Sequence, residues 1–227
     1  MQPRAMFRRS DTREVKVGGV SVGGGAPVSV QTMCNADPRD AAGLSEQIAA
    51  CAALGCDIIR LTVPDVESAK VFGEVRKSSP IPMVADIHFD YRCALAAIEA
   101  GADALRLNPG NIGSKGNVQA VARAAKEKKV PIRIGVNAGS LERDLAAEVA
   151  AGARRAPLLV KSAMRHLKLL EDEGFRDVVI SAKASNVAET IEVYRMLAET
   201  TDRPLHLGVT EAGTAYGGII KSSVGIG

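Results

Sequence analysis

The sequence contains no tryptophan, only three tyrosines and four phenylalanines, although 46% of its 227 residues are hydrophobic. The core must therefore be built from alanine, valine, isoleucine and leucine, which suits strands that are covered on both faces. The length favours one domain, because single α/β barrels commonly need about 250 residues. Together these features exclude a disordered chain and favour an α/β protein.

The chain also lacks a large excess of either charge. It has 29 basic and 26 acidic residues, a net charge of +3, which provides no broad basic field for nucleic acid. No apolar run approaches the ~20 residues of a membrane span, and the arginine-rich residues 1–16 lack the apolar segment of a secretory signal. We expect a cytoplasmic protein that binds neither nucleic acid nor membrane, so any anion site must be local.

Cysteine is scarce, and the four thiols of Cys34, Cys51, Cys56 and Cys93 include no C-x-x-C pair. A chain of this length with its own core needs no disulfide framework. Free cysteine packs as a small hydrophobic residue, so we expect reduced and mostly buried thiols. We predict no metal site in this chain.

Short β-rich runs alternate with helical patterns along the sequence. One helix is indicated by Leu44, Ile48 and Cys51 at helical spacing, followed by Gly55 where a left-handed cap would lie. Strand–helix alternation predicts parallel strands joined by right-handed crossovers, in a closed TIM-type barrel; an open doubly wound sheet is the alternative. The seven candidate strands are residues 28–32, 58–63, 83–87, 104–107, 132–136, 178–182 and 205–209.

Seven strands are one fewer than the eight of a complete barrel. We therefore expect residues 1–227 to form one substrate-binding barrel that stops before the last strand. Open strand edges promote association, so we also expect poor solubility as a monomer.

Polar residues recur at every second position of the candidate strands, which places them on one face of the sheet. Because the apolar partners must meet the outer helices, the polar set should point into the barrel, towards the strand C-termini where barrel enzymes place their sites. The set includes Arg60, Thr62, Asp86, His88, Arg106, Asn108, Arg133, Gly135, Asn137, Ser181, Lys183, Ser185, His206 and Thr210.

The predicted mouth of the barrel is cationic, because Arg60, Arg106, Arg133 and Lys183 come from four strands. Only Asp86 and Glu211 are evident counter-charges, and concentrating cations in a low-dielectric pocket is costly without a bound anion. A substrate with two phosphates would supply the missing charge, with arginines binding phosphate oxygens bidentately. The alternative is a lumen of satisfied ion pairs.

Two loops follow these strands. Glycines in residues 108–113 and 137–140 would let backbone N–H groups approach a phosphate, although either loop is equally consistent with an ordinary turn. Glu211, Asp86, His88 and His206 are candidates for proton transfer at the strand ends. His166, on an alanine- and leucine-rich helix face, is expected to be packed or at the surface.

Four motifs, in this order, resemble the 4-hydroxy-3-methylbut-2-enyl diphosphate synthase family: residues 84–92 (Val-Ala-Asp-Ile-His-Phe-Asp-Tyr-Arg), 105–113, 133–140 and 210–213. The similarity extends over residues 13–227. It implies a TIM-type barrel that binds 2-C-methyl-D-erythritol 2,4-cyclodiphosphate, which is opened reductively to 4-hydroxy-3-methylbut-2-enyl diphosphate in isoprenoid precursor synthesis.

The resemblance also implies roles for individual residues. Glu211 would assist proton transfer as the ring opens. The residues implied in diphosphate binding are Arg60, Arg106, Arg133 and Lys183, with Asn108, Asn137 and Ser185 nearby and Lys221 and Ser222 matching a phosphate-side motif more loosely. The sequence departs from the family pattern at Cys34 and Ala36, where the family often has threonine.

The family further implies a C-terminal domain with a 4Fe-4S cluster held by three cysteines and a glutamate. Flavodoxin or ferredoxin would supply electrons, and in a homodimer the cluster domain of one subunit would close over the barrel of the other. No cysteine here lies in a cluster-ligand motif. We therefore expect that this chain alone does not catalyse the reduction.

Two other functions compete with this interpretation. A phosphometabolite-binding fragment without turnover would bind the cyclodiphosphate and show no redox chemistry. A pterin-type transferase barrel of dihydropteroate-synthase architecture shares a mouth lined by aspartate, asparagine, lysine and arginine and needs no cluster, but only fold analogy favours it.

Overall fold

The computed structural model describes residues 8–227; residues 1–7, part of the segment expected to carry no secretory signal, lie outside it. Its centre is a six-stranded parallel sheet with the order β3-β4-β5-β6-β7-β8. Each strand pairs with its sequence neighbour, as expected of a TIM-type barrel. The strands are β3 (Gln31–Met33), β4 (Ile58–Thr62), β5 (Met83–Asp86), β6 (Ala104–Leu107), β7 (Ile132–Asn137) and β8 (Val178–Lys183).

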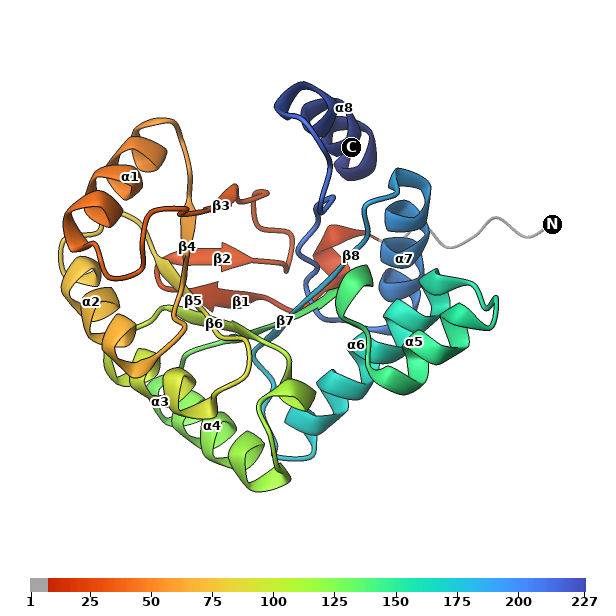
Figure 1. The fold of residues 1–227 in the computed structure, drawn as a ribbon, viewed down its shortest axis with the longest axis horizontal. Helices are drawn as coiled ribbons and strands as arrows, with labels where there is room; N and C mark the ends of the chain where they lie inside the picture. Colours follow the sequence, from red (N-terminus) through yellow and green to blue (C-terminus); the bar gives the residue numbers. More distant parts are fainter. Residues whose placement is uncertain (1–7) are drawn as a thin grey trace.

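Helices follow the outer face of the curved sheet, leaving the side between β3 and β8 open (Figure 1). The last helix, α8, projects at that open side and buries none of its residues. The helices are α1 (Ala41–Ala53), α2 (Val66–Arg76), α3 (Tyr91–Glu99), α4 (Lys115–Lys128), α5 (Arg143–Ala150), α6 (Arg155–Glu171), α7 (Val187–Thr200) and α8 (Ala215–Ile226). The predicted TIM-type architecture is confirmed, in the form of a half-barrel.

Side-chain caps fix where several helices begin. The side chains of Asp40, Asp65, Asp90 and Asn186 each accept a hydrogen bond from a backbone N–H in the first turn of α1, α2, α3 and α7. Such caps satisfy N–H groups that have no partner within the helix. Each cap follows a strand closely, so it sets the point at which the chain leaves the mouth and turns back along the outside.

A short antiparallel hairpin, β1 (Val15–Val17) and β2 (Val20–Val22), precedes the barrel and was not predicted. Val17 packs against Ile58, Val84 and Ala104, which lie at or near the starts of β4, β5 and β6. The hairpin therefore covers the N-terminal end of the sheet interior with an apolar layer. The polar residues further along the same strands are left facing the opposite end.

The predicted strand boundaries are correct to within a residue or two for the middle of the sheet, but the first and the last need correction. The first strand is Gln31–Met33, not residues 28–32. Residues 205–209 form no strand, and only Leu205 makes a bridge, to Ile180. The sheet accordingly has six strands, not seven.

Tyr194 of α7 explains why residues 205–209 do not complete a ladder with β8. The N–H of His206 donates to Ile180 O at 2.8 Å and that of Thr210 to Ala184 O at 3.1 Å, so the register is kept at both ends. Between them, the Tyr194 hydroxyl donates to the His206 carbonyl at 2.5 Å. The hydroxyl thus occupies the place of a direct backbone hydrogen bond.

The predicted state of the thiols is confirmed. All four cysteines are free; Cys34, Cys56 and Cys93 are buried and Cys51 is half-buried. In residues 8–227, no helix is both long enough and apolar enough to cross a membrane.

Two leucines at opposite ends of α1 test the packing of the helical layer. Leu44 is 2% exposed, whereas Leu54, which caps the helix, is 90% exposed. We predict that Leu44→Ala lowers the free energy of unfolding by about 2–5 kcal/mol, because it leaves a cavity. Leu54→Ala should change it by less than about 0.5 kcal/mol. Urea unfolding of both variants measures this; equal losses would contradict the packing described.

Candidate functional site

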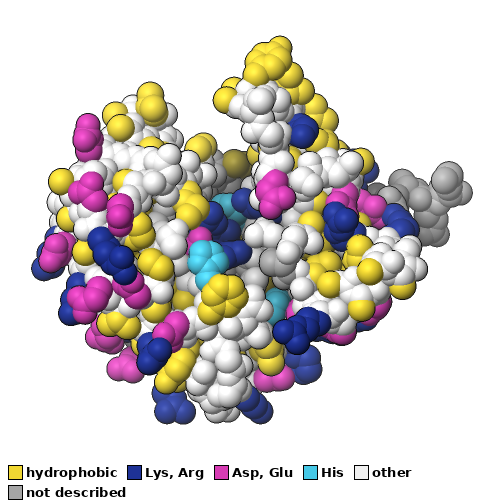
Figure 2. All heavy atoms as spheres, in the orientation of Figure 1, with side chains coloured by type: hydrophobic (Ala, Val, Ile, Leu, Met, Phe, Trp, Pro, Cys, Tyr) yellow, Lys and Arg dark blue, Asp and Glu magenta, His cyan; other side chains and the backbone are white. Residues whose placement is uncertain are grey.

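A cavity of about 350 Å³ opens at the C-terminal ends of the strands. Figure 2 shows this face hollowed near its middle, with histidine, lysine and arginine side chains gathered in the hollow. Eight of the predicted site residues lie around it: Arg60, Asp86, His88, Arg106, Asn108, Arg133, Asn137 and Lys183. Strand register accounts for this, because Asp86 pairs with Arg106, Arg106 with Arg133, and Asn137 with Lys183 across neighbouring strands.

Asp86 is the one buried carboxylate among the residues that line this cavity, with its side chain 3% exposed. Its oxygens lie 3.1 Å from Arg106 Nη1 and 3.5 Å from Arg60 Nε. His88 Nε2 is 3.8 Å away, at the more exposed side. Asp86 therefore holds two guanidinium groups on adjacent sides of the cavity, but a single negative charge cannot balance the remaining cations.

The position of Arg106 depends on a glycine in the neighbouring strand. A Cβ added to Gly135 would lie 2.1 Å from Arg106 Nε, so only glycine leaves room for the guanidinium to cross β7. Arg106 Nη2 donates to the Gly135 carbonyl at 2.6 Å. The Asn108 amide donates to the same carbonyl at 3.0 Å and accepts from the Gly135 N–H at 2.8 Å. The Asn108 side chain thereby takes the place of a backbone peptide in the hydrogen-bond ladder between β6 and β7.

The surroundings of Arg133 and Lys183 destabilise the charged forms of both side chains. Burial, together with the guanidiniums of Arg60 and Arg106, lowers the pKa of Arg133, and its Nη2 is buried without a hydrogen-bond partner. Burial, followed by the charges of Arg133, Arg60 and Arg106, lowers the pKa of Lys183 to about 7. A bound anion would relieve both groups, because it would favour their charged forms.

Five predicted site residues lie outside the lining of this cavity. Ser185 and His206 are half-buried; burial and the charges of Arg133 and Lys183 hold the pKa of His206 well below its ordinary value. Glu211 is exposed, in a left-handed conformation with φ of 50°, and its Oε1 lies near Gly139 at the mouth. Lys221 and Ser222 lie on α8, with Lys221 exposed.

His166 proves to be buried and joins the two loops that follow β6 and β7. Its Nδ1 accepts from the Gly110 N–H at 3.0 Å, and its Nε2 lies 3.6 Å from a carboxylate oxygen of Glu142; the Ser162 hydroxyl donates to the other oxygen. Burial is the main cause of the lowered pKa of His166, so the ring is neutral with Nδ1 as acceptor. The Gly110 N–H is therefore committed within the protein and is not available to a phosphate.

Sequence reasoning left several lining residues out of the predicted site. Met33 accepts from Arg60 Nε at 3.2 Å; it was missed because the first strand was predicted to end one residue earlier. Ser181 and Thr210 shared the inward parity but were given no role. Tyr194, from the outer helix α7, reaches the site from behind β8, and burial raises its pKa to about 12. No strand pattern predicts such a contact.

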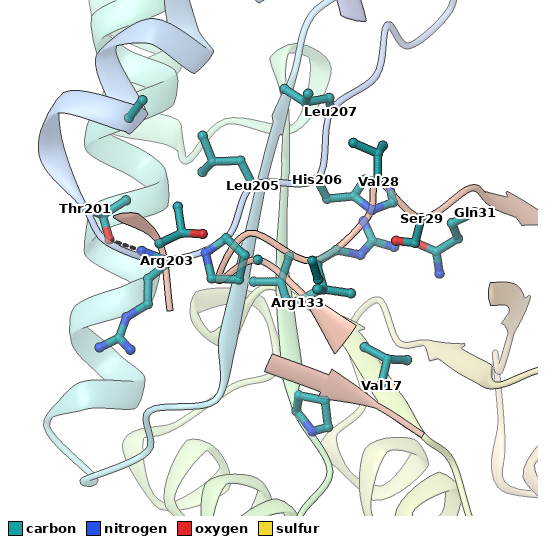
Figure 3. A pocket seen from close by; sticks show the side chains of 18 of the residues that line it. Val17, Val28, Ser29, Gln31, Arg133, Thr201, Arg203, Leu205, His206 and Leu207 are labelled. Carbon is teal, nitrogen blue, oxygen red and sulfur yellow. Dashed lines mark hydrogen bonds between the residues drawn. The ribbon is translucent and has the colours of Figure 1, made fainter. Parts of the chain in front are cut away.

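A second, larger cavity of about 840 Å³ lies at the open side of the half-barrel. Figure 3 shows Arg133 and His206 among the side chains that line it, together with Val28 and Ser29. Arg133 lines both cavities, so its guanidinium lies at the boundary between the cationic mouth and a mostly apolar interior.

Within residues 8–227, no group of three or more histidine, cysteine, aspartate or glutamate side chains could hold a metal ion. The cationic cavity instead offers guanidinium, ammonium and amide donors. This set is suited to phosphate oxygens rather than to metals.

Comparison with known sequences identifies close relatives. Residues 12–227 match the family described as the GcpE TIM-barrel domain. The 4-hydroxy-3-methylbut-2-en-1-yl diphosphate synthase (flavodoxin) of Geobacter sulfurreducens is 52% identical over 96% of this chain and 62% of that protein. The enzyme of the same name from Clostridium acetobutylicum is 54% identical over 97% of this chain and 63% of that protein. The chain thus spans less than two thirds of the length of these relatives.

Solved structures support the fold alone. A type I 3-dehydroquinate dehydratase from Clostridium difficile superposes with a TM-score of 0.66 at 15% identity, covering 93% of this chain and 84% of that one. The dihydropteroate synthase of Yersinia pestis gives a TM-score of 0.58 at 14% identity, over 87% and 76% of the two chains.

Removing the Lys183 ammonium should stabilise the ligand-free protein in a pH-dependent way. Its folded pKa of about 7 lies below the unfolded value of about 10.4, so the unfolded state binds more protons between these limits and stability rises with pH. We predict that Lys183→Met raises the urea midpoint at pH 7 and that this gain shrinks by pH 10. Lys168→Met, at an exposed position, is the control; a gain that grows with pH would contradict the assignment.

The contact between His166 and Gly110 is tested by His166→Phe, which keeps a ring but removes the acceptor. A buried N–H without a partner costs about 1–3 kcal/mol. The Gly110 amide should therefore exchange with solvent roughly tenfold faster or more, in hydrogen-exchange mass spectrometry of the loop peptide. Lys168→Ala, on the same helix, should leave that exchange rate unchanged. Unaltered exchange in His166→Phe would show that the hydrogen bond does not hold the loop.

Proposed function

Because this chain belongs to the GcpE TIM-barrel family, we propose that it forms the substrate-binding barrel of an enzyme of isoprenoid precursor synthesis. The reaction proposed is the reductive opening of 2-C-methyl-D-erythritol 2,4-cyclodiphosphate to 4-hydroxy-3-methylbut-2-enyl diphosphate. Relatives about half identical in sequence carry the name of that synthase. Residues 1–227 would constitute the barrel domain of the enzyme.

The excess of cations in the mouth is the observation that carries the proposal. Arg60, Arg106, Arg133 and Lys183 share the cavity with one buried carboxylate, that of Asp86. A cyclic diphosphate carries its negative charge on two neighbouring phosphates, so a compact cluster of cations can bind both at once. Arginine forks bind phosphate oxygens bidentately, and lysine contributes a point charge.

Roles are proposed for the remaining residues according to where they lie. Asn137 would orient the phosphates, with Asn108 nearby and held against Gly135, and Ser185 and His206 would lie behind them. Asp86 and His88, whose facing atoms are 3.8 Å apart, would move protons at the ring. Glu211, which is exposed at the mouth, would assist proton transfer as the ring opens. Lys221 and Ser222 of α8 would contribute from the open side of the half-barrel.

The described residues do not fit an iron–sulfur cluster. Three of the four cysteines are buried and separate from the cavity, and no group of metal-ligating side chains forms in residues 8–227. We propose that a 4Fe-4S cluster is held elsewhere in the active enzyme, with flavodoxin as electron donor, ferredoxin as its substitute, and a homodimer as the working unit. The flavodoxin assignment is supported by the names of the relatives.

The pterin-type transferase has less support. The superposition with a dihydropteroate synthase, at 14% identity, concerns the fold alone. A phosphometabolite-binding fragment without turnover shares every binding residue with the proposed function. The binding fragment and the proposed enzyme differ only in whether the bound substrate is reduced.

Calorimetric binding of the cyclodiphosphate at low and high salt tests the proposal. We predict salt-sensitive binding that weakens about tenfold to a hundredfold for each arginine lost, because a hydrogen bond to a charged group contributes about 1.5–3 kcal/mol. The variants are Arg106→Ala, Arg133→Ala and the two combined. The control is Arg165→Ala, an exposed arginine paired with Asp144 on the outer surface. Tight binding of a pterin diphosphate, without binding of the cyclodiphosphate, would overturn the proposal.

A further inference from the structure

Lys183 is, like Arg133, a cation of the mouth without an acidic partner, but unlike an arginine it can lose its proton. It ends β8, beside Asn137 in register, and lines the cationic cavity. Among the described residues, no side chain or backbone oxygen accepts a hydrogen bond from its Nζ, and no carboxylate forms an ion pair with it. The nitrogen lies over the backbone of Gly208, where an added Cβ would be 2.9 Å away. Only glycine at position 208 leaves enough room for the Lys183 amine.

The charges that face Lys183 come from every neighbouring element. Three are guanidiniums, on β4, β6 and β7, and only Asp86 on β5 opposes them; His206, itself half-buried, faces the same group from the segment after β8. Burial and these positive charges lower the pKa of Lys183 to about 7. A lysine that is desolvated and placed next to other cations is a nucleophile at neutral pH, because much of it is the free amine.

We propose that Lys183 is a reactive amine that condenses reversibly with an aldehyde or ketone carrying a phosphate group. The cavity provides both a binding group for the phosphate and an amine that can attack the carbonyl carbon. The guanidiniums of Arg60, Arg106 and Arg133 attract the phosphate, and the unpartnered amine stands in the same cavity, whose volume of about 350 Å³ suits a small metabolite. The inference rests on the proposed function only in using the same anion site.

The condensation balances without an added oxidant or reductant. The amine lone pair attacks the carbonyl carbon, a C–N bond forms, and a proton passes from nitrogen to the carbonyl oxygen to give a carbinolamine. The C–O bond then breaks, and the hydroxyl leaves as water with the second amine proton. The product is an imine. If the imine takes up a proton, the bound phosphate balances its positive charge.

Pyridoxal 5′-phosphate is a suitable probe because it joins an aldehyde to a phosphate. The chain is incubated with the probe, imines are reduced with sodium borohydride, and labelled lysines are mapped by peptide mass spectrometry. We expect Lys183 to be labelled at least about tenfold faster than exposed Lys168 at pH 7, since an ordinary lysine has a pKa near 10.4. Pyridoxal, which lacks the phosphate, should label Lys183 much more slowly. Equal rates at Lys183 and Lys168 would overturn the proposal.

The pH dependence of labelling shows whether Lys183 reacts because its amine is deprotonated or only because it is accessible. With pyridoxal, which brings no phosphate to shift the amine's pKa, half-maximal labelling of Lys183 should fall near pH 7 and should move to higher pH in Arg60→Gln, which removes one neighbouring charge. Urea unfolding confirms that this variant is folded. Labelling that follows the same pH profile in both proteins would contradict the proposed activation by neighbouring cations.

A parallel titration with inorganic pyrophosphate distinguishes this inference from the proposed function. If pyrophosphate binds and the amine is labelled selectively, both stand, and pyrophosphate should protect Lys183. If pyrophosphate binds but Lys183 is not labelled selectively, the reactive amine is wrong and the anion site remains. If Lys183 is labelled selectively by the aldehyde while pyrophosphate does not bind, the amine stands and the diphosphate site is wrong.

Discussion

The structure depends on one electrostatic constraint: three guanidiniums and one ammonium surround a cavity that contains a single buried carboxylate. Asp86 reaches two of the arginines, and the other two cations are left with depressed pKa values. The sheet can carry this charge because its other face is packed with aliphatic residues and its N-terminal end is closed by the β1–β2 hairpin. Burial of the apolar residues stabilises the fold. The unbalanced cations at the mouth destabilise it, and a bound anion would offset that cost.

Much of this arrangement could be predicted from the sequence because strand side chains alternate with a period of two. Parity alone placed Arg60, Arg106, Arg133 and Lys183 on one face, and parallel pairing brought the four strand ends to one edge. No distance information was needed, since the register of neighbouring strands is set by the barrel. The helix around Leu44 and Ile48 was equally predictable, because both its period and its cap are local properties.

The errors have local physical causes of a different kind. Residues 205–209 have the right parity for a strand, but a tyrosine hydroxyl from α7 occupies a ladder position, and sequence periodicity cannot report a contact between distant segments. The hairpin strands are three residues long, which is too short for a pattern. Glu211, Lys221 and Ser222 follow the last paired segment, so neither register nor parity fixes them. Glu211 was a candidate because it follows the last predicted strand, whereas the assignment of Lys221 and Ser222 depends on family resemblance.

The contacts around Gly135 bear on how such a barrel can evolve. Asn108 supplies both a donor and an acceptor to the Gly135 peptide, and Arg106 occupies the space that any side chain at 135 would fill. A substitution at 135 would displace the arginine, and an aspartate at 108 would put an acceptor where a donor is required. These three positions, two on β6 and β7 and one directly after β6, therefore depend on one another. Lineages that replace one member are expected to replace the others as well.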